Sequence, residues 1–174
     1  MNIVTLCTGN VARSVMLGYM LTTLAEANGS DWSIRTAGTH VIEGSAMSSR
    51  TRDALMKLDD LGAHHFSGHR SHQLTDDDVR WCDALLACEA ANVDFVRTHH
   101  GDGAAKAVIF QQFLREAPLD EDLDEQVRYV ASLEPIAFFD VEDPAGKDQA
   151  AYDACAEQLW EMAQVFAALE TEEL

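Results

Sequence analysis

Ile3-Val4-Thr5-Leu6-Cys7-Thr8-Gly9-Asn10-Val11-Ala12-Arg13-Ser14, near the amino end of the chain, is the stretch that decides its fold. Its first four residues are apolar or β-branched and predict a buried strand. Apolar residues at helical spacing follow Ser14, so the residues in between form a short loop from a strand into a helix. The Cys-x5-Arg spacing puts a nucleophile and a cation at the two ends of this loop.

The loop has the parts of an anion-binding site. Its backbone N–H groups gather at the amino end of a helix, where the helix dipole adds partial positive charge. Gly9 permits a tight turn, Asn10 tolerates left-handed backbone angles, and Arg13 offers a planar fork for two phosphate oxygens. The same field favours the thiolate form of Cys7, the attacking species. We expect these loop residues to bind phosphate: Thr8, Gly9, Asn10, Val11, Ala12, Arg13 and Ser14.

Strands and helices alternate along the rest of the chain. Apolar spacing predicts helices over 17–24, 54–61 and 152–169, a helix start at 75–78, and strands over 32–36, 84–88 and 106–110. This alternation predicts an α/β fold with a central four-stranded parallel sheet and helices on both faces. The phosphate-binding loop joins the first strand to the first helix.

The length of 174 residues, 47% of them hydrophobic, fits a single domain over residues 1–174. The segment at about 111–140 is acidic at 120–125 and then has apolar residues at helical spacing. We predict a helical insertion there, of one or two helices near the site, which either helps to select the substrate or packs outside it.

Composition limits the partners of the protein. A formal net charge of −18 argues against nucleic acid or an anionic membrane as a partner. No stretch approaches the roughly 18 to 20 apolar residues of a membrane span. The four cysteines, Cys7, Cys82, Cys88 and Cys155, suggest no disulfide framework. We expect an acidic, cytoplasmic protein that needs no cofactor and no metal, with its oligomeric state left open.

Several motifs, in order, resemble the low-molecular-weight protein tyrosine phosphatase family over nearly the whole chain. They are Cys7-Thr8-Gly9-Asn10 with Arg13-Ser14, Thr36-Ala37-Gly38-Thr39, His69-Arg70-Ser71-His72-Gln73-Leu74, the strand from Asp83 to Glu89 with Asn92, and Asp143-Pro144. The third of these is similar to the family's His-Arg-Ala-Arg-Gln segment, so arginine is the family's residue where this chain has His72. The strand is similar to one that ends in Met-Asp in the family.

The resemblance implies a phosphomonoester hydrolase, of the protein tyrosine phosphatase type, that works through a phosphocysteine intermediate. Cys7 would attack phosphorus, Arg13 and the loop amides would hold the equatorial oxygens, and Asp143 would protonate the leaving oxygen. Asp140 and Glu142 are competing carboxylates, but neither precedes a proline.

The resemblance also implies two supporting residues. Ser14 would stabilise the departing thiolate of Cys7, and His69 would support Asn10 rather than touch the substrate. The substrate would be a phosphorylated protein or a small aryl phosphate.

The chain departs from the family at positions that matter for the substrate. Ala12 replaces a second loop cysteine, and Ala145-Gly146 replaces the one or two tyrosines that usually follow Asp-Pro. The loop 40–44, where the family commonly has an aromatic residue, has Val41 and Ile42 instead. A phosphotyrosine slot built from these residues lacks its two aromatic walls.

Two other functions remain open from the sequence. A thioredoxin-coupled arsenate reductase shares this fold and first loop, and Cys82 and Cys88 lie in roughly the region where it keeps two further cysteines. A non-catalytic phosphate-binding module would need Cys7 or Asp143 to be displaced from the site.

Overall fold

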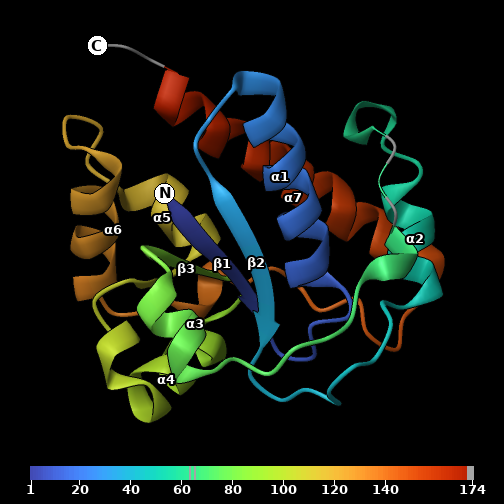
Figure 1. Cartoon of the computed structure of the whole chain (residues 1–174), viewed down its shortest axis with the longest axis horizontal. Helices are drawn as coiled ribbons and strands as arrows, with labels where there is room; N and C mark the ends of the chain where they lie inside the picture. Colours follow the sequence, from blue (N-terminus) through green and yellow to red (C-terminus); the bar gives the residue numbers. More distant parts are fainter. Residues whose placement is uncertain (63, 65, 172–174) are drawn as a thin grey trace.

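A parallel sheet of four strands forms the centre of the molecule, in the order β2-β1-β3-β4 (Figure 1). The computed structural model describes residues 1–62, 64 and 66–171. Their strands are β1 (Asn2–Cys7), β2 (Ser33–Gly38), β3 (Ala84–Ala87) and β4 (Ala107–Ile109). The predicted α/β class and parallel sheet are confirmed, and residues 172–174 of the predicted domain lie outside the described residues.

Helices cover both faces of the sheet, as expected. They are α1 (Arg13–Asn28), α2 (Ser49–Leu55), α3 (Asp76–Trp81), α4 (Ala90–His99), α5 (Phe110–Glu116), α6 (Leu123–Ser132) and α7 (Gln149–Thr171). Helices α1, α5, α6 and α7 pack on one face, and α3 and α4 pack on the other (Figure 1). Among the described helices, none is both long and apolar enough to cross a bilayer.

Strand β1 divides its side chains between two cores. Ile3 and Cys7 belong to the core under α1 and α7, while Val4 and Leu6 belong to the core under α3 and α4. All four are almost fully buried. Successive side chains of a strand point to opposite faces, so a strand covered on both sides must be apolar throughout. This is why the run before Cys7 reads as continuously apolar or β-branched.

Two residues that the sequence marks as helix ends, Gly29 and Thr75, do end and start helices, but one predicted helix has different bounds. Gly29, at φ 70°, closes α1, and Thr75 with Asp78 forms a capping box that starts α3. The predicted helix over 54–61 is wrong in its bounds. Helix α2 ends at Leu55, and an extended Leu58 separates it from a 3-10 turn at Asp59–Leu61. Leu61 is still buried in the same core as Leu55, which explains the helix-like spacing.

The segment at 111–140 contains most of α5 and all of α6, so its helical content agrees with the prediction. The prediction that this segment lies near the site is wrong for the first turns of α6. These turns line a cavity with Cys82 and Lys106, which precede β3 and β4. They therefore lie at the amino ends of the strands, whereas Cys7 ends β1. Burial of Val127 and Val130 in the core accounts for this position.

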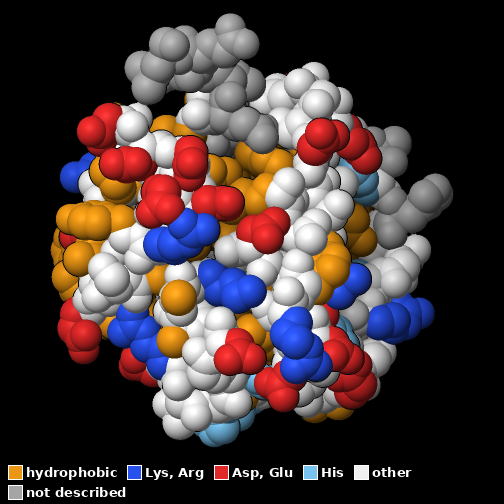
Figure 2. All heavy atoms as spheres, turned by 60° about the vertical axis from the view of Figure 1, so that its left-hand side comes forward, with side chains coloured by type: hydrophobic (Ala, Val, Ile, Leu, Met, Phe, Trp, Pro, Cys, Tyr) orange, Lys and Arg blue, Asp and Glu red, His pale blue; other side chains and the backbone are white. Residues whose placement is uncertain are grey.

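Acidic side chains lie in several separate groups on the face that Figure 2 shows, with lysine and arginine side chains between them. On this face, the charges that make up the net −18 are spread out rather than gathered into one patch. This arrangement is typical of an ordinary solvated surface.

Gly38, at the carboxyl end of β2, allows a close approach to the phosphate-binding loop. Its N–H donates to the carbonyl of His72, and its carbonyl accepts from the N–H of Leu74, both at 2.9 Å. A Cβ at this position would lie 2.7 Å from the Thr8 carbonyl oxygen and 2.5 Å from Val41 Cγ2. Only glycine fits where a backbone comes this close.

We predict that Gly38→Ala displaces the backbone at Thr8 and lowers the melting temperature by about 3–10 °C, the range expected for overpacking of 1–3 kcal/mol. Thermal unfolding followed by circular dichroism measures this. Gly101→Ala is the matched control, because its added Cβ meets no atom within 4 Å. Equal melting temperatures for the two variants would contradict the close approach.

Candidate active site

The loop between β1 and α1 turns around the sulfur of Cys7. Among the described residues other than glycine, only Asn10 has a positive φ, 50°. The N–H of Asn10 points to Cys7 Sγ at 3.3 Å, and Ser14 Oγ lies 3.0 Å from the same sulfur. The left-handed turn expected of this loop is therefore at Asn10, while Gly9 is not among the glycines with positive φ.

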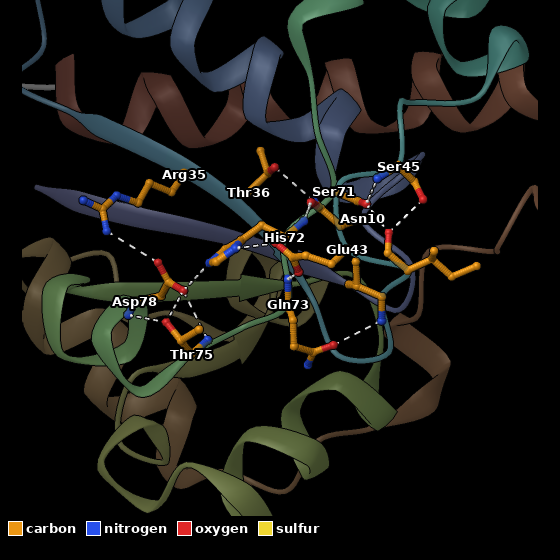
Figure 3. Close-up of polar contacts among 12 residues, drawn as sticks. Asn10, Arg35, Thr36, Glu43, Ser45, Ser71, His72, Gln73, Thr75 and Asp78 are labelled. Carbon is orange, nitrogen blue, oxygen red and sulfur yellow. Dashed lines mark hydrogen bonds and ion pairs between the residues drawn. The ribbon is translucent and has the colours of Figure 1, made fainter.

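Asn10 is completely buried, and its side chain joins three segments of the chain (Figure 3). Its Nδ2 donates to Ser14 Oγ at 2.9 Å and to Thr36 Oγ1 at 3.0 Å. Its Oδ1 accepts from the backbone N–H of His72 at 2.9 Å. Because Ser14 Oγ accepts from Asn10, its own hydrogen is available to the sulfur of Cys7.

His69 contacts the same residue through the backbone. Its Nε2 lies 2.8 Å from the Asn10 carbonyl oxygen, and a carbonyl only accepts, so Nε2 carries the hydrogen. Burial lowers the pKa of His69 and outweighs the opposing effect of this hydrogen bond. The neutral ring, which still has the required donor, is thereby favoured. This contact is the one expected for a residue that supports the loop.

The guanidinium of Arg13 is buried, with 2% of the side chain exposed. Its two Nη atoms donate to the two carboxylate oxygens of Glu89, at 3.0 and 3.2 Å. Its remaining contacts are to the Val141 carbonyl and to Asp143 Oδ2, both at 3.0 Å. Burial opposes the charge, but pairing with Glu89 outweighs it, so the pKa of Arg13 lies above its ordinary value. Arg13 thus brings a permanent positive charge to the loop.

Glu89, which follows β3 and precedes α4, accepts hydrogen bonds from both Arg13 and the loop residue Thr8. Its Oε1 accepts from Thr8 Oγ1 at 2.6 Å and from Asn92 Nδ2 at 3.3 Å. Burial raises the pKa of Glu89, but the hydrogen bonds from Arg13 and Thr8 lower it by more, so the pKa lies below its ordinary value. Glu89 is therefore ionised at neutral pH and holds one side of the guanidinium.

Of the three acidic candidates for the proton donor, Asp143 is the one in contact with Arg13. It lies on the Asp-Pro loop, is 44% exposed, and its Oδ1 accepts from the Ala145 N–H. Asp140 accepts from the N–H of Ala90, the first residue of α4, at 2.7 Å. Glu142 is mostly exposed and pairs with Lys147. Asp143 is therefore the carboxylate that lies beside Arg13.

The model of the family described as low molecular weight phosphotyrosine protein phosphatase matches residues 2–173. The chain belongs to this family. Members of the family hydrolyse phosphorylated substrates through a phosphocysteine, and this chain is a phosphatase of that type. A comparison with curated proteins gave no match.

Solved structures of phosphatases share the fold. A low molecular weight protein tyrosine phosphatase from T. tengcongensis is 26% identical, with a TM-score of 0.76, and the match covers 95% of this chain and 97% of that one. YwlE arginine phosphatase from Geobacillus stearothermophilus is 24% identical, with a TM-score of 0.75 and coverage of 99% and 94%. The tyrosine phosphatase Wzb from Escherichia coli K30, in complex with sulphate, is 19% identical, with a TM-score of 0.72 and coverage of 96% of both chains.

Cys82 and Cys88, the candidate relay pair of a reductase, are not placed side by side. Cys82 precedes β3 and Cys88 follows it, so the two are about 20 Å apart at the rise of a strand. Burial raises the pKa of Cys82 to about 11 and that of Cys155 to about 12. Burial also raises the pKa of Cys88. Thiols of this kind are inert, as expected of core residues.

Sequence reasoning gave no role to three residues that complete the site of this phosphatase. Glu89 pairs with Arg13, Thr36 accepts from Asn10, and His72 donates to Asn10 through its backbone. The position of Glu89 just after a buried strand is the one feature of the sequence that could have indicated a role for it in the site. No group of three or more His, Cys, Asp or Glu within residues 1–62, 64 and 66–171 is arranged to hold a metal ion.

We predict that Glu89→Gln lowers kcat/KM for an aryl phosphate by about ten- to hundredfold, because a charged hydrogen bond to buried Arg13 is worth about 1.5–3 kcal/mol. Steady-state kinetics measure the loss, and thermal unfolding shows whether the variant is folded at the assay temperature. Glu142→Gln is the control, since its partner Lys147 is on the surface. Wild-type kinetics in folded Glu89→Gln would remove this residue from the positioning of Arg13.

Proposed function

We propose that Cys7, Arg13 and Asp143 carry out the hydrolysis of phosphotyrosine in proteins or of small aryl phosphates. The observation that supports this assignment is the convergence at the carboxyl end of β1. Asn10 N–H and Ser14 Oγ point to the Cys7 sulfur, and Arg13 links the loop to Asp143 at 3.0 Å. A nucleophile, an anion site and an acid are thus within one group of contacts.

In the first step, the Cys7 thiolate attacks phosphorus in line, so that the S–P bond forms as the P–O bond to the leaving group breaks. The N–H groups of residues 8–13 and the guanidinium of Arg13 hold the three equatorial oxygens. Asp143 gives its proton to the leaving oxygen. Phosphate oxygens in the loop compete with Asp143 for Arg13, which frees the carboxyl group to face the leaving group.

In the second step, water attacks the phosphocysteine. Asp143, now ionised, takes a proton from this water, the P–O bond forms, and the S–P bond breaks. Ser14 donates its hydroxyl hydrogen to the departing thiolate, as its 3.0 Å contact with Cys7 Sγ allows. Pro144 restricts the backbone next to Asp143 and so limits the directions that the carboxyl can take.

The substrate slot is proposed to be wide. Ile42 is 83% exposed, and Ala145 follows Asp143-Pro144, so neither residue provides an aromatic wall. Ring pairs contribute about 0.5–1.5 kcal/mol beyond burial, and we expect weak preference for phosphotyrosine over simple aryl phosphates. Phosphoarginine is the comparison substrate, because YwlE arginine phosphatase shares the fold.

We also propose a cytoplasmic location, in which nucleic acid and membranes are not partners. All four cysteines are free and buried, which suits a reducing compartment. The net charge of −18 disfavours anionic polymers and surfaces. The proposed reaction uses only side chains, backbone N–H groups and water, and needs no cofactor.

We predict that Cys7→Ser abolishes hydrolysis of an aryl phosphate, a phosphotyrosine peptide and a phosphoarginine peptide, but still binds inorganic phosphate, because the amides and Arg13 remain. Initial rates, calorimetry with phosphate, and acid-quench trapping of phosphocysteine in the wild type measure this. Turnover by Cys7→Ser would exclude Cys7 as the nucleophile. Wild-type reduction of arsenate with thioredoxin, without phosphatase activity, would favour the reductase, and phosphate binding without either activity would favour a binding module.

We predict that Asp143→Asn slows hydrolysis of substrates with poor leaving groups by about a hundredfold and of those with good leaving groups much less, since only the former need the proton. A series of aryl phosphates of graded leaving-group pKa gives the slope. Asp140→Asn and Glu142→Gln are the controls and should keep the wild-type slope. A wild-type slope in Asp143→Asn would shift the role to another carboxyl group.

A further inference from the structure

His72 lies at the centre of a group of charged side chains next to the site (Figure 3). Its backbone N–H donates to Asn10 Oδ1 at 2.9 Å, and this contact does not depend on the side chain. Its ring lies between two carboxylates, with Nε2 at 2.8 Å from Asp78 Oδ2 and Nδ1 at 3.3 Å from Glu43 Oε1. Arg35 Nη1 approaches the other oxygen of Asp78 at 3.4 Å.

Glu43 belongs to residues 39–45, which we name the rim loop. The N–H groups of Thr39 and His40 donate to the carbonyls of Cys7 and Thr8, at 3.0 and 2.9 Å. One end of the rim loop is therefore hydrogen-bonded to the backbone of Cys7 and Thr8, at the start of the phosphate-binding loop. Its tip, with exposed Ile42, lies in the segment where a wall of the substrate slot is expected.

The rest of the rim loop is held by the segment that contains His72. Gly44 N–H donates to the Ser71 carbonyl at 2.8 Å, and Glu43 Oε2 accepts from Gln73 N–H at 2.8 Å. The ring of His72 adds a second contact to Glu43 (Figure 3). Of the contacts between the two segments, this one involves a side chain that titrates near neutral pH.

The two ring contacts together require a protonated His72. Ionised carboxylates only accept hydrogen bonds, whereas a neutral imidazole has one donor and one acceptor. After loss of the proton, one ring nitrogen presents a lone pair to a carboxylate. Asp78 is 8% exposed and also binds Thr75 and Arg35, while Glu43 is 62% exposed. The contact to Glu43 is therefore the one that is lost.

We propose that His72 is a titratable positioning residue, which holds the rim loop of the active site through Glu43 when protonated and releases that contact when neutral. The proposal rests on the proposed function, because the rim loop matters only if it borders the substrate slot. Residues other than His72 keep the loop attached after release. The effect of the proton is therefore on the fit of large substrates rather than on bond cleavage.

The direction of the titration follows from the surroundings of the ring. Partial burial lowers the pKa of His72, but hydrogen bonds to Asp78 and Glu43 outweigh burial and raise it above the ordinary 6.5. The pKa values of both carboxyls lie below their ordinary ranges. Hydrogen bonds from Gln73 and His72 lower that of Glu43, and hydrogen bonds from Thr75 and His72 outweigh burial at Asp78. The stabilising contact is complete below pH 6.5 and is lost as pH rises through the higher pKa of the folded protein.

The test compares the wild type with His72→Arg and His72→Gln between about pH 6.5 and 8.5, a range in which histidine titrates and phosphate esters are mostly dianionic. Arginine carries a permanent charge, and glutamine carries none. We expect the wild-type KM for a phosphotyrosine peptide to rise about two- to fivefold across this range, as for loss of an exposed ion pair. His72→Arg should keep the low KM and His72→Gln the high KM throughout, with kcat following one common profile.

An independent measurement does not depend on catalysis. Nitrogen-15 relaxation of the amides of residues 39–45 should show increased mobility as the imidazole of His72 titrates, and His72→Arg should abolish this change. Glu43→Gln should give a mobile rim loop at every pH. If the loop titrates but KM does not change, the rim loop does not border the substrate slot and the proposal is overturned. The proposal is likewise overturned if neither changes, or if His72→Arg follows the wild type. Absence of hydrolysis with a titrating loop would instead refute the proposed function.

Discussion

The hydrogen bonds of Asn10 are the constraint on which the site depends. A buried amide and a buried peptide group must find partners inside the protein, because no water is there to replace them. Asn10 finds them on α1, on β2 and on the segment 69–72. These elements must be assembled before the left-handed turn at Asn10 is stable. The phosphate-binding loop is therefore a product of tertiary structure, although its residues are contiguous.

The order of the strands explains why the loop lies where it does. From β1 the chain continues to β2 on one side, and later to β3 and β4 on the other. In open parallel sheets, ligands bind outside the carboxyl ends of the strands, where the order reverses. Gly38 at the end of β2 and Glu89 after β3 flank Cys7 from the two sides. The same topology brings Asp143 back to this edge, through the hydrogen bond of Val141 to Cys88.

In the proposed mechanism, an anionic protein binds an anionic substrate because the local field at the loop outweighs the net charge. Exposed charges act weakly beyond a Debye length of about 8 Å at physiological ionic strength. The Asn10 N–H lies 3.3 Å from the Cys7 sulfur, and buried Arg13 is the first residue of α1. Glu89 neutralises part of the charge of Arg13 but also keeps the guanidinium in place.

The α/β class and the strand-loop-helix unit from Ile3 to Ser14 could be predicted from the sequence, as could the candidate residues of the site. They could be predicted because apolar periodicity and the Cys-x5-Arg spacing are local properties, and because Asn28-Gly29 and Thr75 act on their own helices. Tertiary structure alone decided that Glu89 pairs with Arg13, that His72 lies between Glu43 and Asp78, and that α6 begins at the far end of the sheet. These contacts join residues that are far apart in the chain, and their partners depend on strand order and packing. The sequence already separates Asp143 from Asp140 and Glu142 by the proline that follows it. The contact of Asp143 with Arg13 depends on the folded chain.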